Sequence, residues 1–438
     1  MRRIKCSIGW NIADIDRQLK SGEITFRSKK RDTNPGVVAA PDIVRKFVGI
    51  NNLTTRQNKV LTSDQRLLWI NGPAGSGKTV ILSAKILGMV LCNENDKVVL
   101  IKFGGEDNNS THYQDALKRA KITFSQTETY IAKHKPYELA GQISKSSVQV
   151  CIVKVTGASD LTWLNETISL LDQYHVFVDD IHSKLWMNPV RRYEDLINTL
   201  KRKSATKTVW LACDLMQGYD AMRLGVMKQF ATVLANGLTS DQVVSLSMNL
   251  RNTCDLSDLL SMIRTLYKSA SEKAAVFDLV LPKQIPGHSI RGPKTVFHVL
   301  NHCGVTTLSH LVNEEMKKLL VKGTLRENEI AILYPTITTA FKSAIKDVLS
   351  TFSNNPETDI AFCTSTHSNS AEWPAVIVLH KMFPDVEMQL SALYQAIARA
   401  RVYCSVILYP GEGKTVEESR SMITLLDKLS DLVNIVWY

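Results

Sequence analysis

The residues best suited to chemistry stand in one glycine-rich turn, Gly72-Pro73-Ala74-Gly75-Ser76-Gly77-Lys78-Thr79. An apolar run, Leu67–Ile70, comes before the turn, and a helical pattern, Val80–Leu91, follows it. The order G-x-x-x-x-G-K-T between a strand and a helix predicts a phosphate-binding loop. Its glycines allow the backbone to curl so that successive N–H groups point inward, and the helix adds the positive end of its dipole.

We expect this turn to bind the phosphates of a nucleotide. Lys78 is expected to reach the β and γ phosphates, and the Thr79 hydroxyl to bind Mg²⁺. The alternative is a glycine-rich surface turn, which does not explain the flanking strand and helix. The predicted nucleotide-binding residues of the turn are Gly72, Gly75, Ser76, Gly77, Lys78 and Thr79.

Two further polar sites follow predicted strands. The apolar run ending at Val178 leads into Asp179 and Asp180. Asp179 is expected to hold Mg²⁺ and Asp180 to orient the attacking water, although an ordinary acidic strand end is the alternative. Another apolar run ends in Asp214, and Gln217 follows it. Because the carboxyl ends of parallel strands converge on one crevice, we expect Asp214 and Gln217 near the γ-phosphate.

Strand and helix patterns alternate through the first half of the chain, as they must to position these groups. Continuous apolar strands separated by helices predict a parallel, doubly wound α/β sheet. The predicted strands are 67–71, 97–103, 148–155, 174–179, 208–214 and 242–246, and the predicted helices include 80–91, 159–173 and 192–201.

The same alternation resumes after about residue 250 and predicts a second α/β domain without its own phosphate loop. Its predicted strands are 295–300, 329–333, 360–363, 375–379 and 403–408, and its helices 256–268, 307–321, 340–349 and 390–399. We divide the chain into a basic N-terminal segment, 1–46, a first domain, 47–246, and a second domain, 247–438. The basic segment is either an arm that contacts nucleic acid or a solvated leader.

Composition narrows the class of protein. A chain of 438 residues is too long for one ordinary domain, and 44% of its residues are hydrophobic. No apolar run approaches the length of about 18 residues that crosses a membrane, and the N-terminus lacks the apolar segment of a signal peptide. The eight cysteines are scattered singly, which favours a reducing intracellular compartment, cytoplasm or nucleus, and argues against a structural zinc site. A net charge of +11 suits a polyanionic partner, or simply a basic soluble protein.

Taken in order, these stretches resemble the motifs of the UvrD/Rep-type superfamily 1 helicases. The resemblance runs from about residue 53 to 409 and is more specific than any single motif. The matching stretches are Leu53–Gln57 (Q motif), Asp179-Asp180 (motif II), Asp214 with Gln217 (motif III), Leu246–Thr253 (motif IV), Glu329–Tyr334, Thr366-His367-Ser368 with Glu372-Trp373-Pro374 (motif V), and Tyr394–Arg401 (motif VI).

The resemblance implies two RecA-like domains that share one ATP in the cleft between them. Gln57 would read adenine through its amide. Arg251 and Arg399 would reach across from the second domain to stabilise the charge on the transferred phosphoryl group. A structural cap at Arg251 and a solvated helix face at Arg399 are the alternatives. The implied partner is single-stranded DNA or RNA, with Lys102, Lys154, Trp373 and His367 as candidate contacts. For Trp373 the alternative of a core residue is favoured, because Pro374 and an apolar strand follow it.

The chain also departs from the family pattern. Asp180 stands where glutamate is usual, Cys213 where glycine is usual, and motif V lacks its Lys-Gly pair. Motif Ia is hard to find around Lys102–Gly105, and the intervals between motifs leave no room for large accessory subdomains. The chain therefore resembles a compact motor core, comparable to the helicase-like part of Schlafen-type proteins, and a core of this kind is often one module of a larger protein.

These departures leave a second hypothesis open. The chain could be a regulatory nucleotide switch or a nucleic-acid-binding module with weak or no unwinding activity. A phosphotransferase for a small substrate is a poorer fit, because it leaves the ordered motifs after residue 245 unexplained.

Overall fold

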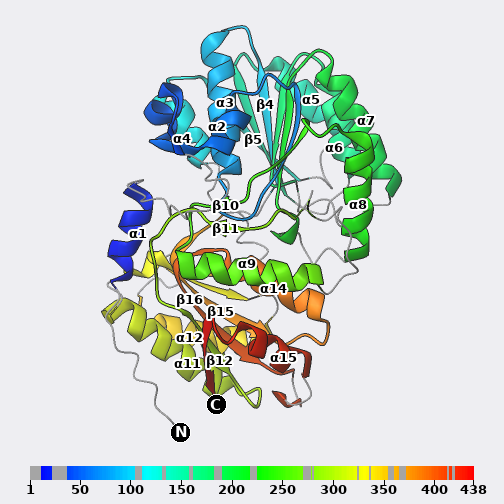
Figure 1. The fold of residues 1–438 in the computed structure, drawn as a ribbon. Helices are drawn as coiled ribbons and strands as arrows, with labels where there is room; N and C mark the ends of the chain where they lie inside the picture. Colours follow the sequence, from blue (N-terminus) through cyan, green and yellow to red (C-terminus); the bar gives the residue numbers. More distant parts are fainter. Residues whose placement is uncertain are drawn as a thin grey trace.

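A computed structural model shows two α/β domains, one above the other (Figure 1). We call the part built on the larger sheet the first domain and the part built on the smaller sheet the second domain. The structure describes residues 11–21, 37–103, 111–130, 135–156, 161–181, 190–217, 224–269, 278, 281–322, 325–334, 337–353, 360–364, 371–411, 414–416 and 420–438.

The first domain contains a seven-stranded sheet in the order β5-β6-β4-β7-β8-β3-β9, with every neighbouring pair parallel. Its strands are β3 (Leu67–Asn71), β4 (Val98–Phe103), β5 (Phe124–Tyr130), β6 (Val150–Thr156), β7 (His175–Asp179), β8 (Val209–Cys213) and β9 (Val243–Ser245). The helices that accompany them are α2 (Thr55–Leu61), α3 (Lys78–Cys92), α4 (Thr111–Arg119), α5 (Pro136–Lys145), α6 (Leu161–Leu170), α7 (Val190–Ser204) and α8 (Leu224–Gly237).

The second domain contains a six-stranded parallel sheet in the order β14-β13-β15-β16-β12-β17. Its strands are β12 (Thr295–Val299), β13 (Ile330–Tyr334), β14 (Ala361–Thr364), β15 (Trp373–Lys381), β16 (Ala400–Tyr409) and β17 (Val433–Trp437). Its helices are α9 (Cys254–Ser269), α11 (Val305–Lys317), α12 (Thr339–Ser350), α14 (Val386–Ile397) and α15 (Arg420–Leu429). A short parallel pair, β10 (Met248–Asn249) and β11 (Ile285–Pro286), lies between the two sheets.

The predicted fold class, two parallel doubly wound sheets, is confirmed. The expected strands are present within three residues of their predicted ends, because each is a continuous apolar run. Two strands of the large sheets were missed, and both lie at a sheet edge; the short strands of the pairs β1-β2 and β10-β11 were not predicted either. The sequence of β5, FSQTETY, is polar at every position between its two terminal aromatic residues, and β17 is a short run of five residues.

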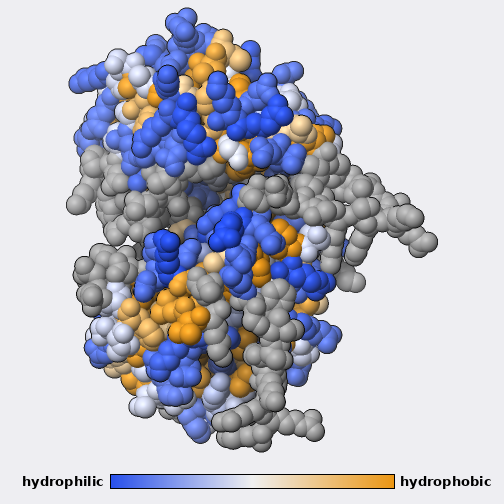
Figure 2. All heavy atoms as spheres, turned by 90° about the vertical axis from the view of Figure 1, so that its left-hand side faces the viewer, coloured by the Kyte–Doolittle hydropathy of each residue, from blue (hydrophilic) through white to orange (hydrophobic). Residues whose placement is uncertain are grey.

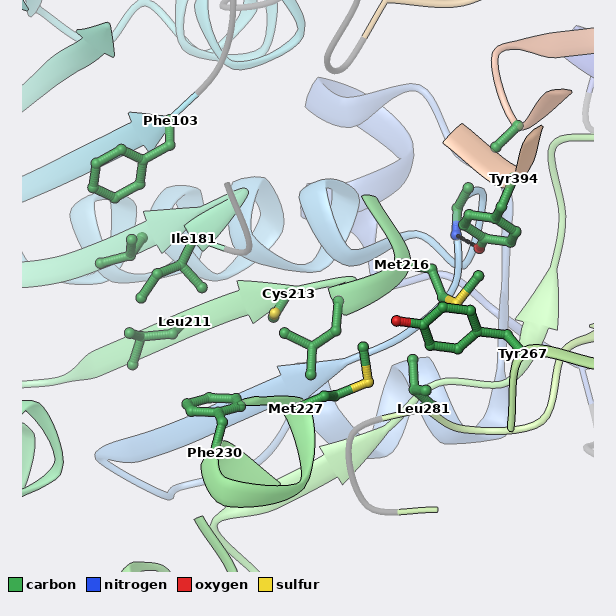
Figure 3. Close-up of a cluster of buried hydrophobic side chains, with 14 of the residues drawn as sticks. Phe103, Ile181, Leu211, Cys213, Met216, Met227, Phe230, Tyr267, Leu281 and Tyr394 are labelled. Carbon is green, nitrogen blue, oxygen red and sulfur yellow. Dashed lines mark hydrogen bonds between the residues drawn. The ribbon is translucent and has the colours of Figure 1, made fainter. Parts of the chain in front are cut away.

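One hydrophobic cluster runs without interruption from the first domain into the second. Met216 and Met227 of the first domain lie next to Tyr267 and Leu281, and the cluster continues to Tyr394 of α14 (Figure 3). All five side chains are buried. The two domains therefore touch along a dry, packed surface on the side of α9 and α14.

The N-terminal part of the chain touches both domains. Helix α1 (Ile12–Ser21) buries Ile12, Ile15 and Leu19 in the core of the second domain. By contrast, β1 (Val37–Ala39) pairs with β2 (Asn52–Thr54), and the π-helical turn η1 (Val44–Val48) packs on the first domain. Within the described residues, no helix has the length and apolar character needed to span a bilayer. Residues 1–10 and 22–36 of the predicted basic segment lie outside the described residues.

Candidate nucleotide-binding site

A cleft of about 340 Å³ opens between the two domains at the end of the phosphate loop. Residues from both domains line it. The first domain contributes Ile50, Asn52, Leu53, Gln57, Ala74, Gly75, Gly77, Lys78, Thr79, Val80, Lys102, Asp180 and Gln217, and the second domain contributes Leu250, Arg251, Glu372 and Arg399. The cleft thus brings together most of the residues that the sequence singled out. Figure 2 shows the face on the α1 side, where hydrophilic side chains of both domains lie near the junction.

The phosphate loop needs its glycines for two different reasons. Gly75 and Gly77 have φ angles of +73° and +82°, which other residues rarely adopt. A side chain on Gly75 would also place its Cβ 2.4 Å from Oδ1 of Asn249. The Leu250 N–H donates to the Gly75 carbonyl at 2.9 Å, so the segment carrying Arg251 is attached directly to the loop.

Lys78 is folded back over the loop that precedes it. Its Nζ donates to the carbonyls of Gly72 at 2.8 Å and Pro73 at 3.1 Å. Burial lowers the pKa of Lys78, although Asp214 and Asp180 act against that shift. A lysine held this way stands ready for phosphate, because an anionic oxygen is a stronger partner for a buried ammonium than a carbonyl.

Asp179 accepts several of the hydrogen bonds that organise the first domain's part of the site. Its Oδ2 accepts hydrogen bonds from the Thr79 hydroxyl at 2.9 Å and the Tyr113 hydroxyl at 2.8 Å, and its Oδ1 accepts from the Asp180 N–H at 3.1 Å. Burial, and then the charge of Asp180, raises the pKa of Asp179 to about 6. A buried carboxylate beside a hydroxyl oxygen is a donor set that suits Mg²⁺, which would also favour the charged carboxylate.

Asp180 has a backbone conformation that bears on why an aspartate stands at this position. Its φ angle is +58°, in the left-handed region. Aspartate and asparagine tolerate that region better than residues with longer or branched side chains. The side chain is half-buried and lines the cleft. An aspartate here therefore fits the local geometry of the turn that ends β7.

The second domain places two arginines in the same cleft. Arg399 is 1% exposed, and its Nη2 donates to Oε1 of Gln217 at 3.1 Å. Burial and the neighbouring charge of Arg251 lower the pKa of Arg399 to about 10, so it remains charged at neutral pH. The Nε of Arg251 lies 2.9 Å from a carboxylate oxygen of Glu372, and its Nη2 donates to the Ala398 carbonyl at 2.8 Å. The two guanidinium groups thus share one cavity with Lys78.

Gln57 supports the phosphate loop. Its Nε2 donates to the Ser76 carbonyl at 2.9 Å, and its Oε1 accepts from the Thr54 N–H at 2.9 Å in a capping box that begins α2. Gln57 also lines the cleft. A primary amide has two N–H groups and two lone pairs, so these two bonds still allow Gln57 to read a base.

Two of the residues that the sequence singled out lie in positions different from those predicted. Asp214 was expected beside Gln217 at the phosphates, but it is not among the residues that line the cleft, because Arg264 and Tyr394 hold its carboxylate behind the loop. Lys102 was a candidate contact for nucleic acid, but it is buried and lines the nucleotide cleft instead. The partners of Asp214 are far away in the sequence, so no local pattern predicts its place.

Tyr113 is a site residue that sequence reasoning missed. It lies in α4, is buried, and donates to the Mg²⁺ ligand predicted at Asp179. Nζ of Lys102 lies 5.9 Å from the centre of its ring. No motif marks this tyrosine, so only the folded arrangement identifies it. Trp373 begins β15, half-buried against the core, whereas Thr366, His367 and Ser368 lie outside the described residues.

Comparisons with known proteins agree with this fold. A family model described as nephrocystin 3, N-terminal, matches residues 51–152, the part of the first domain that includes the phosphate loop. No curated protein sequence matches the chain. Among solved structures, the DUF1998 helicase MrfA bound to DNA is similar with a TM-score of 0.50 and 10% identity, over 98% of this chain and 57% of that chain. The DEAD-box helicase Mss116 bound to ssRNA and UDP-BeF is similar with a TM-score of 0.50 and 12% identity, over 91% of this chain and 78% of that one.

These likenesses show a helicase-like fold, with two RecA-like domains. This chain spans little more than half of the length of MrfA. At such low identity the comparisons establish the arrangement of domains and do not distinguish one helicase superfamily from another.

Proposed function

We propose that the chain is an ATP-hydrolysing nucleic-acid motor of the UvrD/Rep type, reduced to a compact core, with RecA-like domains at 47–246 and 247–438. One observation carries this proposal. Arg251 and Arg399 of the second domain line the same cavity as Lys78, Thr79 and Asp180 of the first. A site that needs both domains couples the state of the nucleotide to their relative position.

In this proposal the first domain binds MgATP. Lys78 exchanges its two carbonyl partners for phosphate oxygens, and the loop N–H groups and the start of α3 favour the negative charge. Thr79 and Asp179 hold Mg²⁺, which when bound neutralises charge on the phosphate oxygens. Gln57 keeps the loop in shape and reads adenine with the remaining positions of its amide.

Hydrolysis uses groups from both domains. Asp180 orients the attacking water, and Gln217 senses the γ-phosphate. Arg399, already held against Gln217 at 3.1 Å, stabilises the charge that develops on the transferred phosphoryl group. Arg251 supplies the second positive charge when phosphate competes with Glu372 for its guanidinium group.

The proposed partner is single-stranded DNA or RNA. The net charge of +11 supports a polyanion, and MrfA and Mss116 are similar structures solved with DNA and ssRNA. The free thiols of Cys151, Cys213 and Cys404 support a reducing intracellular compartment, cytoplasm or nucleus. We also propose that the chain can serve as a module within a longer protein.

An ATPase assay with and without single-stranded DNA and RNA tests this proposal, followed by an assay for duplex separation. We expect hydrolysis that either polymer stimulates at low salt, and we expect Lys78→Ala to reduce it to the uncatalysed background. Wild-type turnover that persists in Lys78→Ala would remove the site assignment.

A second candidate function is a regulatory nucleotide switch, with weak or no unwinding. The short Asp180 side chain in a left-handed backbone favours it, because a shorter carboxylate reaches less far toward the attacking water. The same assay separates the two candidates. ATP binding with slow hydrolysis that neither polymer stimulates would favour the switch.

A further inference from the structure

The hydroxyl group of Tyr394 has partners in three separate parts of the molecule. It accepts hydrogen bonds from the Ala74 N–H of the phosphate loop at 3.2 Å and from Nη1 of Arg264 at 3.1 Å. It donates to Oδ2 of Asp214 at 3.0 Å. Figure 3 shows the Tyr394 ring beside Met216, and a dashed line marks one of the hydrogen bonds of this hydroxyl. The tyrosine is 0% exposed, so protein groups and not solvent satisfy the hydroxyl.

These contacts lie behind the nucleotide cleft. Tyr394, Asp214 and Arg264 do not line the cavity that Lys78 and Arg399 share. Arg264 completes the cluster, because its Nη1 also donates to Oδ1 of Asp214 at 2.9 Å in a buried ion pair. The cluster therefore binds no nucleotide atom directly.

Two hydrogen bonds join the segment after β8 to the segment at the end of α14. Asp214 and Gln217 belong to one short stretch after β8, and Tyr394 and Arg399 belong to one stretch at the end of α14. Tyr394 bonds to Asp214 behind the phosphate loop, whereas Arg399 bonds to Gln217 inside the cleft. A shift of α14 that breaks the first bond must also move the second.

We propose that Tyr394 is a positioning residue, which holds the phosphate loop and the finger arginine Arg399 in register by bonding Ala74 and Asp214 together. The proposal rests on the ATPase function proposed above and adds a group that touches no substrate. Burial and the charge of Asp214 raise the pKa of Tyr394, so the phenol keeps the proton that it donates. Without the hydroxyl, the Ala74 N–H and one oxygen of Asp214 each lose a buried partner.

Tyr394→Phe tests the proposal with two separate readouts. The first is hydrogen exchange of the phosphate-loop peptide, residues 72–79, which we expect to be faster because the Ala74 N–H loses its acceptor. The second is steady-state ATP hydrolysis, in which we expect kcat to fall about 10- to 100-fold, the size of effect that misplacement of catalytic groups produces, with KM unchanged within about twofold.

Tyr403→Phe is the matched control. Tyr403 is also a buried tyrosine of the second domain, and its hydroxyl donates to Glu315, away from the cleft. We expect neither loop exchange nor kcat to change in this variant. Wild-type exchange and wild-type kcat in Tyr394→Phe, or equal effects from both variants, would overturn the proposal. If the wild type hydrolyses no ATP, the proposed function fails, while the exchange measurement still decides whether Tyr394 holds the loop.

Discussion

The contact between the two domains has two sides that differ in chemistry. On one side, Lys78, Asp180 and Arg399 face a cleft of about 340 Å³. On the other side, Met227 and Leu281 belong to a hydrophobic cluster that continues from one domain into the other. Apolar burial is not directional and gives cohesion, whereas charged groups act only in a particular geometry.

This difference indicates which side holds the two domains together and which side responds to bound nucleotide. The apolar side keeps the domains together whether or not nucleotide is present. The cleft carries an excess of buried positive charge that a triphosphate would balance. Substitutions in the cleft should therefore reduce hydrolysis and leave folding intact, and truncation of purely apolar side chains on the other side should do the reverse.

The largest expected effect is that of Arg399→Ala on hydrolysis. An arginine finger typically contributes about 10³-fold or more to the rate, and we expect a loss of at least about that size. ATP binding should change little, because Lys78 and the loop remain. Turnover by a coupled ATPase assay and binding of a fluorescent ATP analogue separate the two effects. The control is Arg420→Ala, an exposed arginine of the second domain. Hydrolysis that survives in Arg399→Ala would refute the finger role.

The sequence predicted the cleft side better than the apolar side. The turn at 72–79 and the carboxylates at 179 and 180 are local patterns, each next to an apolar strand, so motif and spacing were enough. Both predicted arginines also line the predicted cleft. The apolar side depends on pairs such as Met216 with Tyr267, which no local pattern connects.

Three features were not predicted from the sequence, and each has its own physical reason. Asp214 looks like a phosphate-site residue until Arg264 and Tyr394 are seen to hold it. Tyr113 follows the stretch where a family motif was expected and not found, so nothing marked it. The edge strand β5 was missed because an edge does not require a continuous apolar run.

On the apolar side, Leu281→Ala should lower the free energy of unfolding and leave ATP hydrolysis unchanged. Leu281 is fully buried, and large-to-small changes of this kind cost about 2–5 kcal/mol. Urea unfolding measures the loss, and ATP turnover at low temperature should stay within about twofold of the wild type. Leu91, which is 40% exposed in the first domain, provides the control Leu91→Ala with a much smaller loss. A large fall in kcat at unchanged stability would contradict the division between the two sides.

A fall in pH should lower the free energy of unfolding through a buried histidine of the second domain that lies outside the cleft. Burial lowers the pKa of His380 to about 4, below its ordinary value of 6.5. Between these values the unfolded chain binds the proton and the folded chain does not, so stability falls as the pH drops from about 6.5 towards 4. At pH 5 this histidine should reduce the free energy of unfolding by about 2 kcal/mol.

Urea unfolding at pH 7 and pH 5 measures that loss. His380→Gln should lose less stability over the same interval than the wild type, because its side chain does not titrate there. His310→Gln, at an exposed histidine, should behave like the wild type. An identical pH dependence for His380→Gln and the wild type would show that His380 does not govern the acid response.

The smallest effect is expected from Tyr113→Phe, which tests the cleft side at a group that touches no phosphate. The change removes one of two hydroxyl donors to Oδ2 of Asp179 and leaves the Thr79 donor in place. A hydrogen bond to a charged group contributes about 1.5–3 kcal/mol, so we expect roughly a tenfold fall in turnover and a higher requirement for Mg²⁺.

Tyr174→Phe is the control for Tyr113→Phe, because its hydroxyl donates to the Ile143 carbonyl elsewhere in the first domain. It should alter neither turnover nor the Mg²⁺ requirement. Titration of ATPase activity with Mg²⁺ compares the variants directly. If excess Mg²⁺ restores turnover in Tyr113→Phe, the hydroxyl acts by orienting Asp179 for the metal. If turnover never falls, Thr79 alone holds that carboxylate, and Tyr113 serves only the hydrophobic core of the first domain.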